Sequence, residues 1–321
     1  LSEEQIELLH SATSSVTYPD GTEKMEGYKK TKNREIFNSG MDGSAAYRIP
    51  AIVTSKKTGT VIASIDKRWN GWNDVGVIDS VIRRSEDGGE TWQDIIPVIA
   101  LTGSYAYTVD PALLVDNDEN SEYYGRIYML VDMFQQGTGF GGAQAGTGYV
   151  EAEGKKRLKL TDKNGGVYTV RENGAVYNSQ NEITEYRVET EAAAPFTAQG
   201  ELYKNGVRIG NIYRNSELTF FNTCYLWMTY SDDDGLTWSV PKDITPEVKD
   251  EWMKFCGTGP GMGVQTKSGR LLFPAYCTNA GGIQSSFNVY SDDDGKTWHQ
   301  GGSPNNEGNM ENAESHLTES C

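Results

Sequence analysis

Short runs of apolar residues, bounded by glycine, asparagine and aspartate, follow one another along most of the chain. Examples are "AIVT", "TVIASID" and "DSVIRR" in the first hundred residues, and "RLLFPAYC" and "SSFNVYS" near residue 280. Runs of this length, rich in β-branched and aromatic residues, are typical of β-strands, whereas an amphipathic helix needs a longer stretch with apolar residues every three or four positions. The pattern therefore predicts an all-β protein with many turns.

One motif, S-x-D-x-G-x-T-W, divides these strands into units. It reads "SEDGGETW" at Ser85–Trp92, "SDDDGLTW" at Ser231–Trp238 and "SDDDGKTW" at Ser291–Trp298. Upstream of each copy stand a proline that we expect to precede a first strand (Pro50, Pro111 and Pro260) and a glycine that leads into a second strand (Gly59, Gly125 and Gly269). Each unit thus holds four predicted strands, and a repeated four-stranded antiparallel unit is typical of a β-propeller blade.

The second unit is longer than the other two by about 80 residues. The turn glycine and the motif serine are 26 residues apart in the first unit, 22 in the third and 106 in the second. The extra residues carry hairpin signals, among them "DKNGG" and the pair Asn205-Gly206. We therefore expect a partial propeller over residues 34–321, with a small β subdomain inserted at about residues 137–222.

The first 33 residues differ from the rest. "LSEEQIELL" contains a capping box, in which Ser2 is followed three positions later by Gln5, and this predicts a short helix. Residues 11–33 are polar. We interpret residues 1–33 as the end of a preceding domain and a connector.

The composition of the chain argues against several classes of partner: nucleic acid, membranes, metals and cofactors. The formal net charge is −16, which repels nucleic acid and anionic membranes, so we expect neither as a partner. No apolar run is long enough to insert into a membrane. The four cysteines show no C-x-x-C spacing and the three histidines show no ligand spacing, so we expect no metal and no cofactor, while one or two disulfides remain open.

The repeated motif itself is interpreted as structural. Its aspartate can accept backbone N–H bonds across a tight turn, and its glycine, two residues later, permits the positive φ that such a turn needs. A calcium loop is the alternative, but in EF-hand register the first position of the second copy is Tyr230 and the twelfth is Pro241 instead of glutamate. We expect the motif to build the blade and the chemistry to lie elsewhere.

The beginnings of the first strands are the expected place for chemistry, because a propeller gathers them around one axis. Arg48 in "YRIP", Asp110 in "VDPA" and Glu319 in "LTES" occupy this position in three units. A second cluster, "DKRWNGWND", follows the second strand and holds Arg68 and Asp74. Two tryptophans near Asp74 favour a raised pKa, as a general acid needs. The alternative is a structural Arg–Asp pair at a blade junction.

"YRIP" followed by several such motifs resembles the exo-α-sialidases (neuraminidases), above all the secreted bacterial members, over roughly residues 34–321. The segments "TGTVIASIDKR", "VIRRSEDGGETW", "EWMKF" and "LTE" stand where that family has them. The resemblance implies a sialidase-type β-propeller, six-bladed in the family, of which about three blades and the start of a fourth are present here.

The resemblance also implies roles for single residues. Arg48 corresponds to the first of three arginines that bind the sialic acid carboxylate, for which a planar fork of donors is suited. Asp74 corresponds to the acid/base, and Glu319 to the glutamate that takes the proton of a nucleophilic tyrosine. Arg68 and Asp110 correspond to residues on the 4-hydroxyl side of the sugar. Three further residues correspond to the pocket for the N-acetyl and glycerol groups: Gln265, Phe134 and Phe140.

The implied activity is that of an exo-α-sialidase, which releases terminal sialic acid from glycoconjugates with net retention through a tyrosine nucleophile. An intramolecular trans-sialidase that gives an anhydro-sialic acid is a close alternative. A non-catalytic glycan-binding propeller is an alternative of another class. The tyrosine and two arginines have no counterpart here, so we expect them beyond residue 321 and expect this segment alone to be inactive. Sialylated glycans are the implied partners, and a secreted or cell-surface bacterial location is implied.

Overall fold

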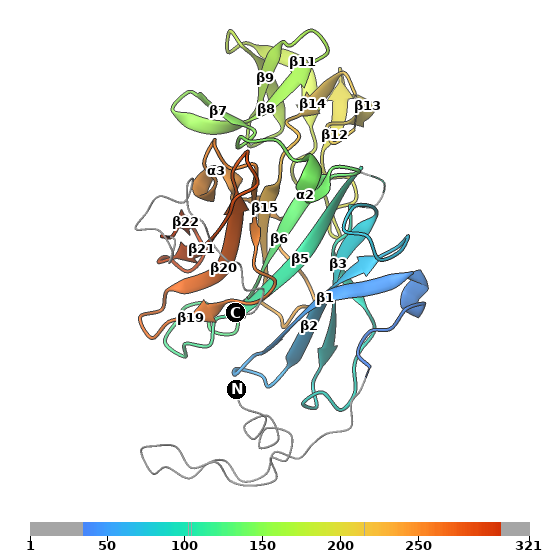
Figure 1. Cartoon of the computed structure of the whole chain (residues 1–321), viewed down its shortest axis with the longest axis vertical. Coiled ribbons are helices and arrows are strands. Elements are labelled where there is room, and N and C mark those ends of the chain that lie inside the picture. Colours follow the sequence, from blue (N-terminus) through green and yellow to red (C-terminus); the bar gives the residue numbers. More distant parts are fainter. Residues whose placement is uncertain (1–34, 102, 104, 215, 303–321) are drawn as a thin grey trace. The chain divides into compact units, whose positions relative to one another are not determined.

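The computed structural model describes residues 35–101, 103, 105–214 and 216–302. Contacts divide the chain after Glu35, and the described elements belong to the unit Ile36–Cys321. The expected N-terminal helix, the connector and Glu319 lie outside the described residues and stay predictions. Regular structure in the described part is almost entirely strand (Figure 1), so the all-β prediction is confirmed. Within this part, no helix has the length and apolar character needed to cross a bilayer.

The strands form three successive antiparallel units of four main strands each. The first holds β1 (Ala46–Thr54), β2 (Val61–Arg68), β3 (Ile78–Ser85) and β4 (Ile96–Ile99). The second holds β5 (Ala106–Val115), β6 (Ile127–Gln135), β15 (Tyr225–Ser231) and β16 (Lys242–Asp243). The third holds β17 (Phe255–Thr258) with β19 (Val264–Gln265), β20 (Leu271–Thr278), β21 (Gln284–Ser291) and β22 (His299–Gln300). The remaining short strand, β18 (Gly261–Met262), leaves the third unit and pairs in parallel with β5.

In the first two units the proline interrupts the first strand instead of preceding it, so that part of the sequence prediction was wrong. Pro50 lies within β1 and Pro111 within β5, and the register with the next strand shifts at both places. The residue before each proline has a positive φ, 61° at Ile49 and 58° at Asp110. Proline has no N–H to contribute to a ladder, so it is tolerated where a bulge already breaks the pairing. In the third unit, Pro260 falls between β17 and β19.

Strands β7 to β14 are inserted between β6 and β15 and form a separate sheet, drawn in green and yellow in Figure 1. Both predicted hairpins are present: β8 and β9 enclose the "DKNGG" turn, and Asn205-Gly206 joins β12 to β13 with φ values of 49° and 78°. The bounds are β7 (Tyr149–Ala152), β8 (Lys155–Asp162), β9 (Val167–Val170), β10 (Ala175–Asn178), β11 (Ile183–Val188), β12 (Glu201–Lys204), β13 (Val207–Asn211) and β14 (Leu218–Phe220). Three short helical turns complete the described elements: η1 (Met41–Gly43), α2 (Gly139–Gly142) and α3 (Thr245–Val248).

Apolar side chains from the middle unit pack on both neighbours and bring the first strands together. On one face, Leu113 and Met129 share a buried cluster with Ile82 of the first unit. On the other face, Leu130 shares a buried cluster with Phe273 of the third unit. Burial of this apolar surface holds the three sheets face to face.

The three copies of the motif have the same geometry. In the second copy, Asp233 Oδ1 accepts the Ser231 hydroxyl at 2.7 Å and the Thr237 N–H at 2.8 Å, and Asp233 Oδ2 accepts the Thr237 hydroxyl at 2.6 Å. The Gly235 N–H donates to Ser231 Oγ at 2.8 Å, and the motif glycines have φ values of 91°, 85° and 79°. The first and third copies repeat these contacts. The motif therefore builds a turn, as predicted.

Two of the motif turns also join neighbouring units. Arg84 of the first unit donates through Nε to the Asp234 carbonyl at 2.5 Å, and Tyr128 of the second unit donates its hydroxyl to the Asp294 carbonyl at 2.9 Å. A methyl group added at Gly235 would lie 2.7 Å from the Ile82 side chain. A turn that is stabilised within itself thus also serves as a contact between blades.

Candidate active site

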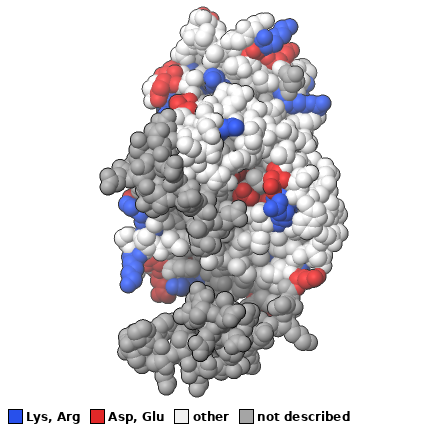
Figure 2. Space-filling view, in the orientation of Figure 1, with Lys and Arg blue, Asp and Glu red and all other residues white. Residues whose placement is uncertain are grey.

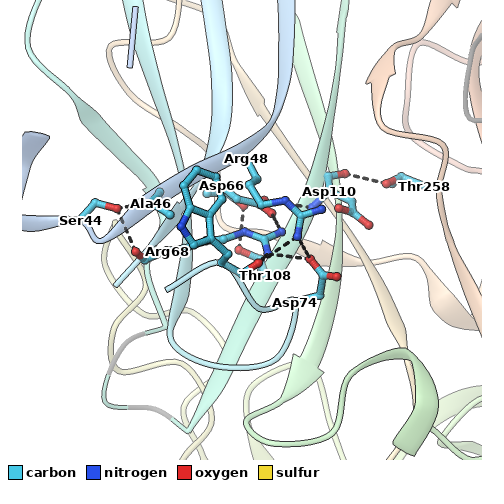
Figure 3. A network of polar contacts seen from close by, with 11 residues as sticks. Ser44, Ala46, Arg48, Asp66, Arg68, Asp74, Thr108, Asp110 and Thr258 are labelled. Atoms are coloured by element: carbon cyan, nitrogen blue, oxygen red, sulfur yellow. Dashed lines mark hydrogen bonds and ion pairs between the residues drawn. The ribbon is translucent and has the colours of Figure 1, made fainter. Parts of the chain in front are cut away.

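The loop that follows β2 is held by two arginines. Arg48 on β1 and Arg68 at the end of β2 both donate through Nη1 to the Trp72 carbonyl, at 2.9 and 2.8 Å. The same two nitrogens bind Asp74 Oδ1 at 2.7 and 2.6 Å (Figure 3). Two guanidinium groups that share two acceptors fix the position of this loop without any regular structure in it.

These three charged side chains differ in their access to solvent. The Arg68 side chain is 1 % exposed, Arg48 is 36 % exposed and Asp74 is 69 % exposed. Arg48 and Asp74 are therefore available to a ligand, whereas Arg68 binds Asp74 from the protein interior.

Arg68 is itself neutralised by a buried carboxylate. Its Nη2 donates to Asp66 Oδ2 at 2.8 Å, and Asp66 is fully buried. Burial and the nearby Asp110 carboxyl raise the pKa of Asp66 well above its usual value, although the Arg68 guanidinium opposes the rise. Burial alone would lower the pKa of Arg68, but the Asp66 and Asp74 carboxylates outweigh it and raise that pKa. Removing either member would leave an uncompensated charge in the interior.

Both backbone groups of Asp110 are held by residues of the neighbouring units. Its N–H donates to Asp66 Oδ1 at 3.1 Å, and its carbonyl accepts the Thr258 hydroxyl from β17 at 2.6 Å. Asp110 needs this support because its φ of 58° lies in the left-handed region, which disfavours residues with a side chain. The bulge and the two hydrogen bonds together aim the Asp110 side chain into the cleft described below.

A second buried carboxyl, Asp132 on β6, supports this arrangement. Its Oδ1 accepts the Thr258 N–H at 2.8 Å, while its Oδ2 has no hydrogen-bond partner in the described structure. Burial, followed by the charge of Asp110, raises the pKa of Asp132 well above its usual value. A Cβ at Gly257 would lie 2.3 Å from Asp132 Oδ2, so only glycine fits there.

A cleft of about 1050 Å³ opens over this cluster. Arg48, Asp74 and Asp110 line the cleft together with residues of β20 and β21, among them Tyr276 and Asn288. Figure 2 shows acidic and basic side chains next to one another in the middle of a face that is otherwise largely uncharged. The structure therefore brings together three predicted site residues: Arg48 and Asp74 of the first unit, the latter in the loop between β2 and β3, and Asp110 of the second.

Two predicted site residues lie elsewhere than expected. Gln265 accepts the Asn117 N–H at 2.9 Å and donates to Asp116 at 2.8 Å, beyond the far end of β5, and it lines a separate hollow of about 630 Å³. The structure does not place Gln265 in the cleft, whereas its neighbour on β19, Val264, does line it, because successive side chains of a strand point to opposite faces. Arg68 does not line the cleft, since its side chain is buried and its two terminal nitrogens bind Asp66, Asp74 and the Trp72 carbonyl. Glu319 lies outside the described residues.

The two predicted pocket aromatics occupy different environments. Phe134 is buried and stacks on Tyr107 and Phe255. Phe140 is 43 % exposed and contacts Phe255 and Tyr276, and Tyr276 lines the cleft. Phe140 is therefore at the edge of the cleft. Phe134 lies in the interior and packs on Phe255, the same ring that Phe140 contacts.

Sequence reasoning missed Asp66, Asp132 and Thr258. A signal for the two acids exists, because each is a single carboxylate inside an otherwise apolar run, "VIASID" and "IYMLVDMF". Aspartate is rarely fully buried unless it is paired, so such positions indicate a specific partner. No signal in the sequence points to Thr258, whose role depends on how the third unit packs. Among the described residues, no group of three or more His, Cys, Asp or Glu side chains is placed to hold a metal ion.

A family model described as a BNR repeat-like domain matches residues 49–311 of the chain. The anhydrosialidase of Macrobdella decora is 33 % identical over 317 residues, which cover 84 % of this chain and 40 % of that protein. Sialidase B of Streptococcus pneumoniae is 30 % identical over 313 residues, which cover 82 % of this chain and 42 % of that protein. The chain thus spans about two fifths of the length of these relatives.

Comparison with solved structures also finds a sialidase-family protein with a similar fold. The intramolecular trans-sialidase from Ruminococcus gnavus, in complex with oseltamivir carboxylate, superposes with a TM-score of 0.71 at 31 % identity. The match covers 83 % of this chain and 62 % of that chain. The predicted sialidase-type fold is therefore confirmed.

Proposed function

The chain belongs to the family of BNR repeat-like domains, and we propose that it forms the N-terminal part of the catalytic propeller of a sialidase. The activity proposed is removal of terminal α-linked sialic acid from glycans, with retention. The observation that carries the proposal is the pair of Arg48 and Asp74, an accessible guanidinium and an accessible carboxylate 2.7 Å apart at the mouth of a cleft. The substrate offers a carboxylate and a glycosidic oxygen on adjacent atoms, so it needs a cation and a proton donor this close together.

In this proposal Arg48 binds the substrate carboxylate and exchanges its bond with Asp74 for one with the ligand. Asp74, released on that side, protonates the leaving oxygen and later activates water. The buried Arg68 keeps the Asp74 loop in place during this exchange, because it retains its bonds to Asp66 and to the Trp72 carbonyl. Asp110 accepts hydrogen bonds from sugar hydroxyls. Glu319 and a tyrosine beyond residue 321 supply the nucleophile.

A second candidate is an intramolecular trans-sialidase, in which a hydroxyl of the sugar replaces water. Two of the similar proteins, the anhydrosialidase of Macrobdella decora and the intramolecular trans-sialidase from Ruminococcus gnavus, favour it. The two reactions share every step up to departure of the leaving group. They differ only in whether water reaches the reacting carbon.

The test uses a protein in which this chain continues into the further blades. It is incubated with sialyllactose, and the product is identified by NMR as free sialic acid or as an anhydro-sialic acid. We expect turnover to fall by a factor of about 10²–10⁴ in Asp74→Asn, because a general acid contributes about that much. Glu86→Gln, an exposed change outside the cleft, is the matched control. Binding of sialosides without turnover of any would instead identify a glycan-binding propeller.

We also expect residues 1–321 alone not to hydrolyse a fluorogenic sialoside, because the other carboxylate-binding arginines would be missing. Sialylated glycans or glycoproteins are the proposed partners. A secreted or cell-surface location in a bacterium is proposed with them, since these substrates are displayed outside cells.

A further inference from the structure

Two cysteines oppose each other across β17 and β20. Cys256 on β17 is the register partner of Cys277 on β20, so both side chains leave the sheet on the same face. The Gly259 N–H donates to the Pro274 carbonyl at 2.8 Å, which makes Gly259 and Pro274 a hydrogen-bonded pair. The two kinds of pair alternate along an antiparallel ladder. Three positions away, Cys256 and Cys277 are therefore a non-hydrogen-bonded pair.

This kind of pair matches the geometry of a disulfide. Directly opposed residues of a non-hydrogen-bonded pair have their Cα atoms about 4.5 Å apart. Disulfides join Cα atoms at about 4.4–6.8 Å. Both cysteines are free in this structure and both are 0 % exposed. The strand register thus places the two cysteines at a separation that a disulfide can span.

We propose that Cys256 and Cys277 form a cross-strand disulfide when the chain folds in an oxidising environment. The oxidant is a low-molecular-weight disulfide of the class of oxidised glutathione. One protein thiolate attacks it, forming a mixed disulfide and releasing one small thiolate. The second protein thiolate then attacks the protein sulfur of the mixed disulfide and releases the other small thiolate. The two protons lost by the cysteines end on the two small thiols, so two protein thiols are oxidised and one reagent disulfide is reduced.

The third described cysteine is the competitor. The Cys224 thiol, just before β15, donates to the Cys256 carbonyl at 3.3 Å, so it is close by. It belongs to the neighbouring unit and faces the backbone of Cys256, whereas Cys277 faces the side chain. The strand register therefore selects Cys277 over Cys224.

Burial decides when the bond can form. Burial raises the pKa of Cys277 to about 12 and also raises that of Cys256, so neither is a thiolate in the folded protein. Exchange with a small disulfide therefore happens during folding or when β17 opens locally. Once formed, the buried bond is protected from reductants by the same packing.

The bond would secure the cluster described above. β17 has only four residues, and it carries Thr258, which holds the Asp110 carbonyl. A link two residues before Thr258 would keep β17 on β20. The proposal does not depend on the sialidase activity, since it concerns only the strand pair.

The experiment uses residues 1–321 with Cys321→Ser, which prevents links between molecules. The protein is refolded either in a mixture of reduced and oxidised glutathione or in excess reductant. Free thiols are then alkylated under denaturing conditions, and peptides are mapped by mass spectrometry. We expect a linked peptide pair containing Cys256 and Cys277 only in the glutathione sample, together with alkylated Cys224. The thermal midpoint should rise by several degrees, because the link closes a loop of about twenty residues in the unfolded chain.

Cys224→Ser is the matched control and should keep both the link and the rise in thermal midpoint. Cys256→Ser and Cys277→Ser should lose both. Three freely alkylated cysteines after refolding in glutathione would overturn the proposal, as would a link that includes Cys224. The peptide map of the parent protein decides the matter even if a single variant fails to fold.

Discussion

The three motif turns and the cluster at the first-strand bulges use aspartate in opposite ways. In the turns each carboxylate is satisfied locally, and the hydroxyl and N–H of Thr91, with the hydroxyl of Ser85, lower the pKa of Asp87 to about 2. In the cluster, Asp66 and Asp132 are fully buried, bind residues of other strands, and have raised pKa values. A turn of the first kind stabilises itself and can be repeated. A cluster of the second kind exists only because the whole fold holds it, and such strained, buried charge is characteristic of functional sites.

The largest effect is expected when the buried ion pair is broken. Arg68→Leu leaves Asp66 buried without its cation, and we expect the free energy of unfolding of residues 1–321 to fall by about 3–5 kcal/mol. Arg270, which binds Asp292 through two nitrogens at the surface, is the control, and Arg270→Leu should change stability very little. Urea unfolding measures both. Equal losses in the two variants would show that burial is not what distinguishes the cluster from the turns.

The second prediction concerns the sign of the pH dependence. Asp132 has a folded pKa above its unfolded value of about 4, so it favours folding below that pH and loses this contribution as the pH rises toward its folded pKa. Asp87 and Asp293 have folded pKa values of about 2, so their contribution is present above about pH 4 and is lost between pH 4 and pH 2.

Urea midpoints between pH 3 and pH 8 test this difference. Asp132→Asn should lose less stability than the parent between pH 4 and pH 8, because asparagine keeps an acceptor for Thr258 and cannot ionise. Asp293→Asn should instead change the acid side of the profile. Parallel profiles for the parent and Asp132→Asn across the neutral range would contradict the prediction.

The third prediction compares two copies of the motif. Asp233→Ala should cost about 1–2 kcal/mol, because it removes three hydrogen bonds and loosens the turn that contacts Arg84 and Ile82 of the first unit. Asp87→Ala should cost less, since its described hydrogen bonds lie within its own turn. Thermal unfolding of the two variants measures the difference. If the order were reversed, the contact between blades would not be the source of the motif's stabilising effect.

Local patterns in the sequence were enough to predict the fold. Features that depend on packing between distant segments could not be predicted from them. Alternating runs, turn glycines and Asn205-Gly206 are short-range signals, so the strands, the hairpins and the motif turns could be predicted. The bulges could not, because a proline next to a strand does not show whether it precedes or interrupts the ladder. The proximity of Arg48, Asp74 and Asp110 could be predicted, because a propeller gathers the first strands of its blades around one axis. Gln265 was misplaced because the sequence does not show which face of the two-residue strand β19 meets the cleft: Val264 lines it and Gln265 does not.

The smallest effect is expected at the residue that joins the third unit to the cluster. Thr258→Val keeps the N–H bond to Asp132 but removes the hydroxyl that holds the Asp110 carbonyl, and we expect a loss of about 1 kcal/mol. Thr297→Val is the matched control. It removes a hydroxyl that donates a hydrogen bond of the same length, 2.6 Å, to Asp293 in the third motif turn. Both variants should fold, so the informative measurement is turnover in a protein that includes the further blades. There Thr258→Val should raise KM for sialyllactose while Thr297→Val leaves it unchanged, because only Thr258 keeps the bulge of β5 directed into the cleft. An unchanged KM in Thr258→Val would mean that Asp110 holds its left-handed conformation without the third unit.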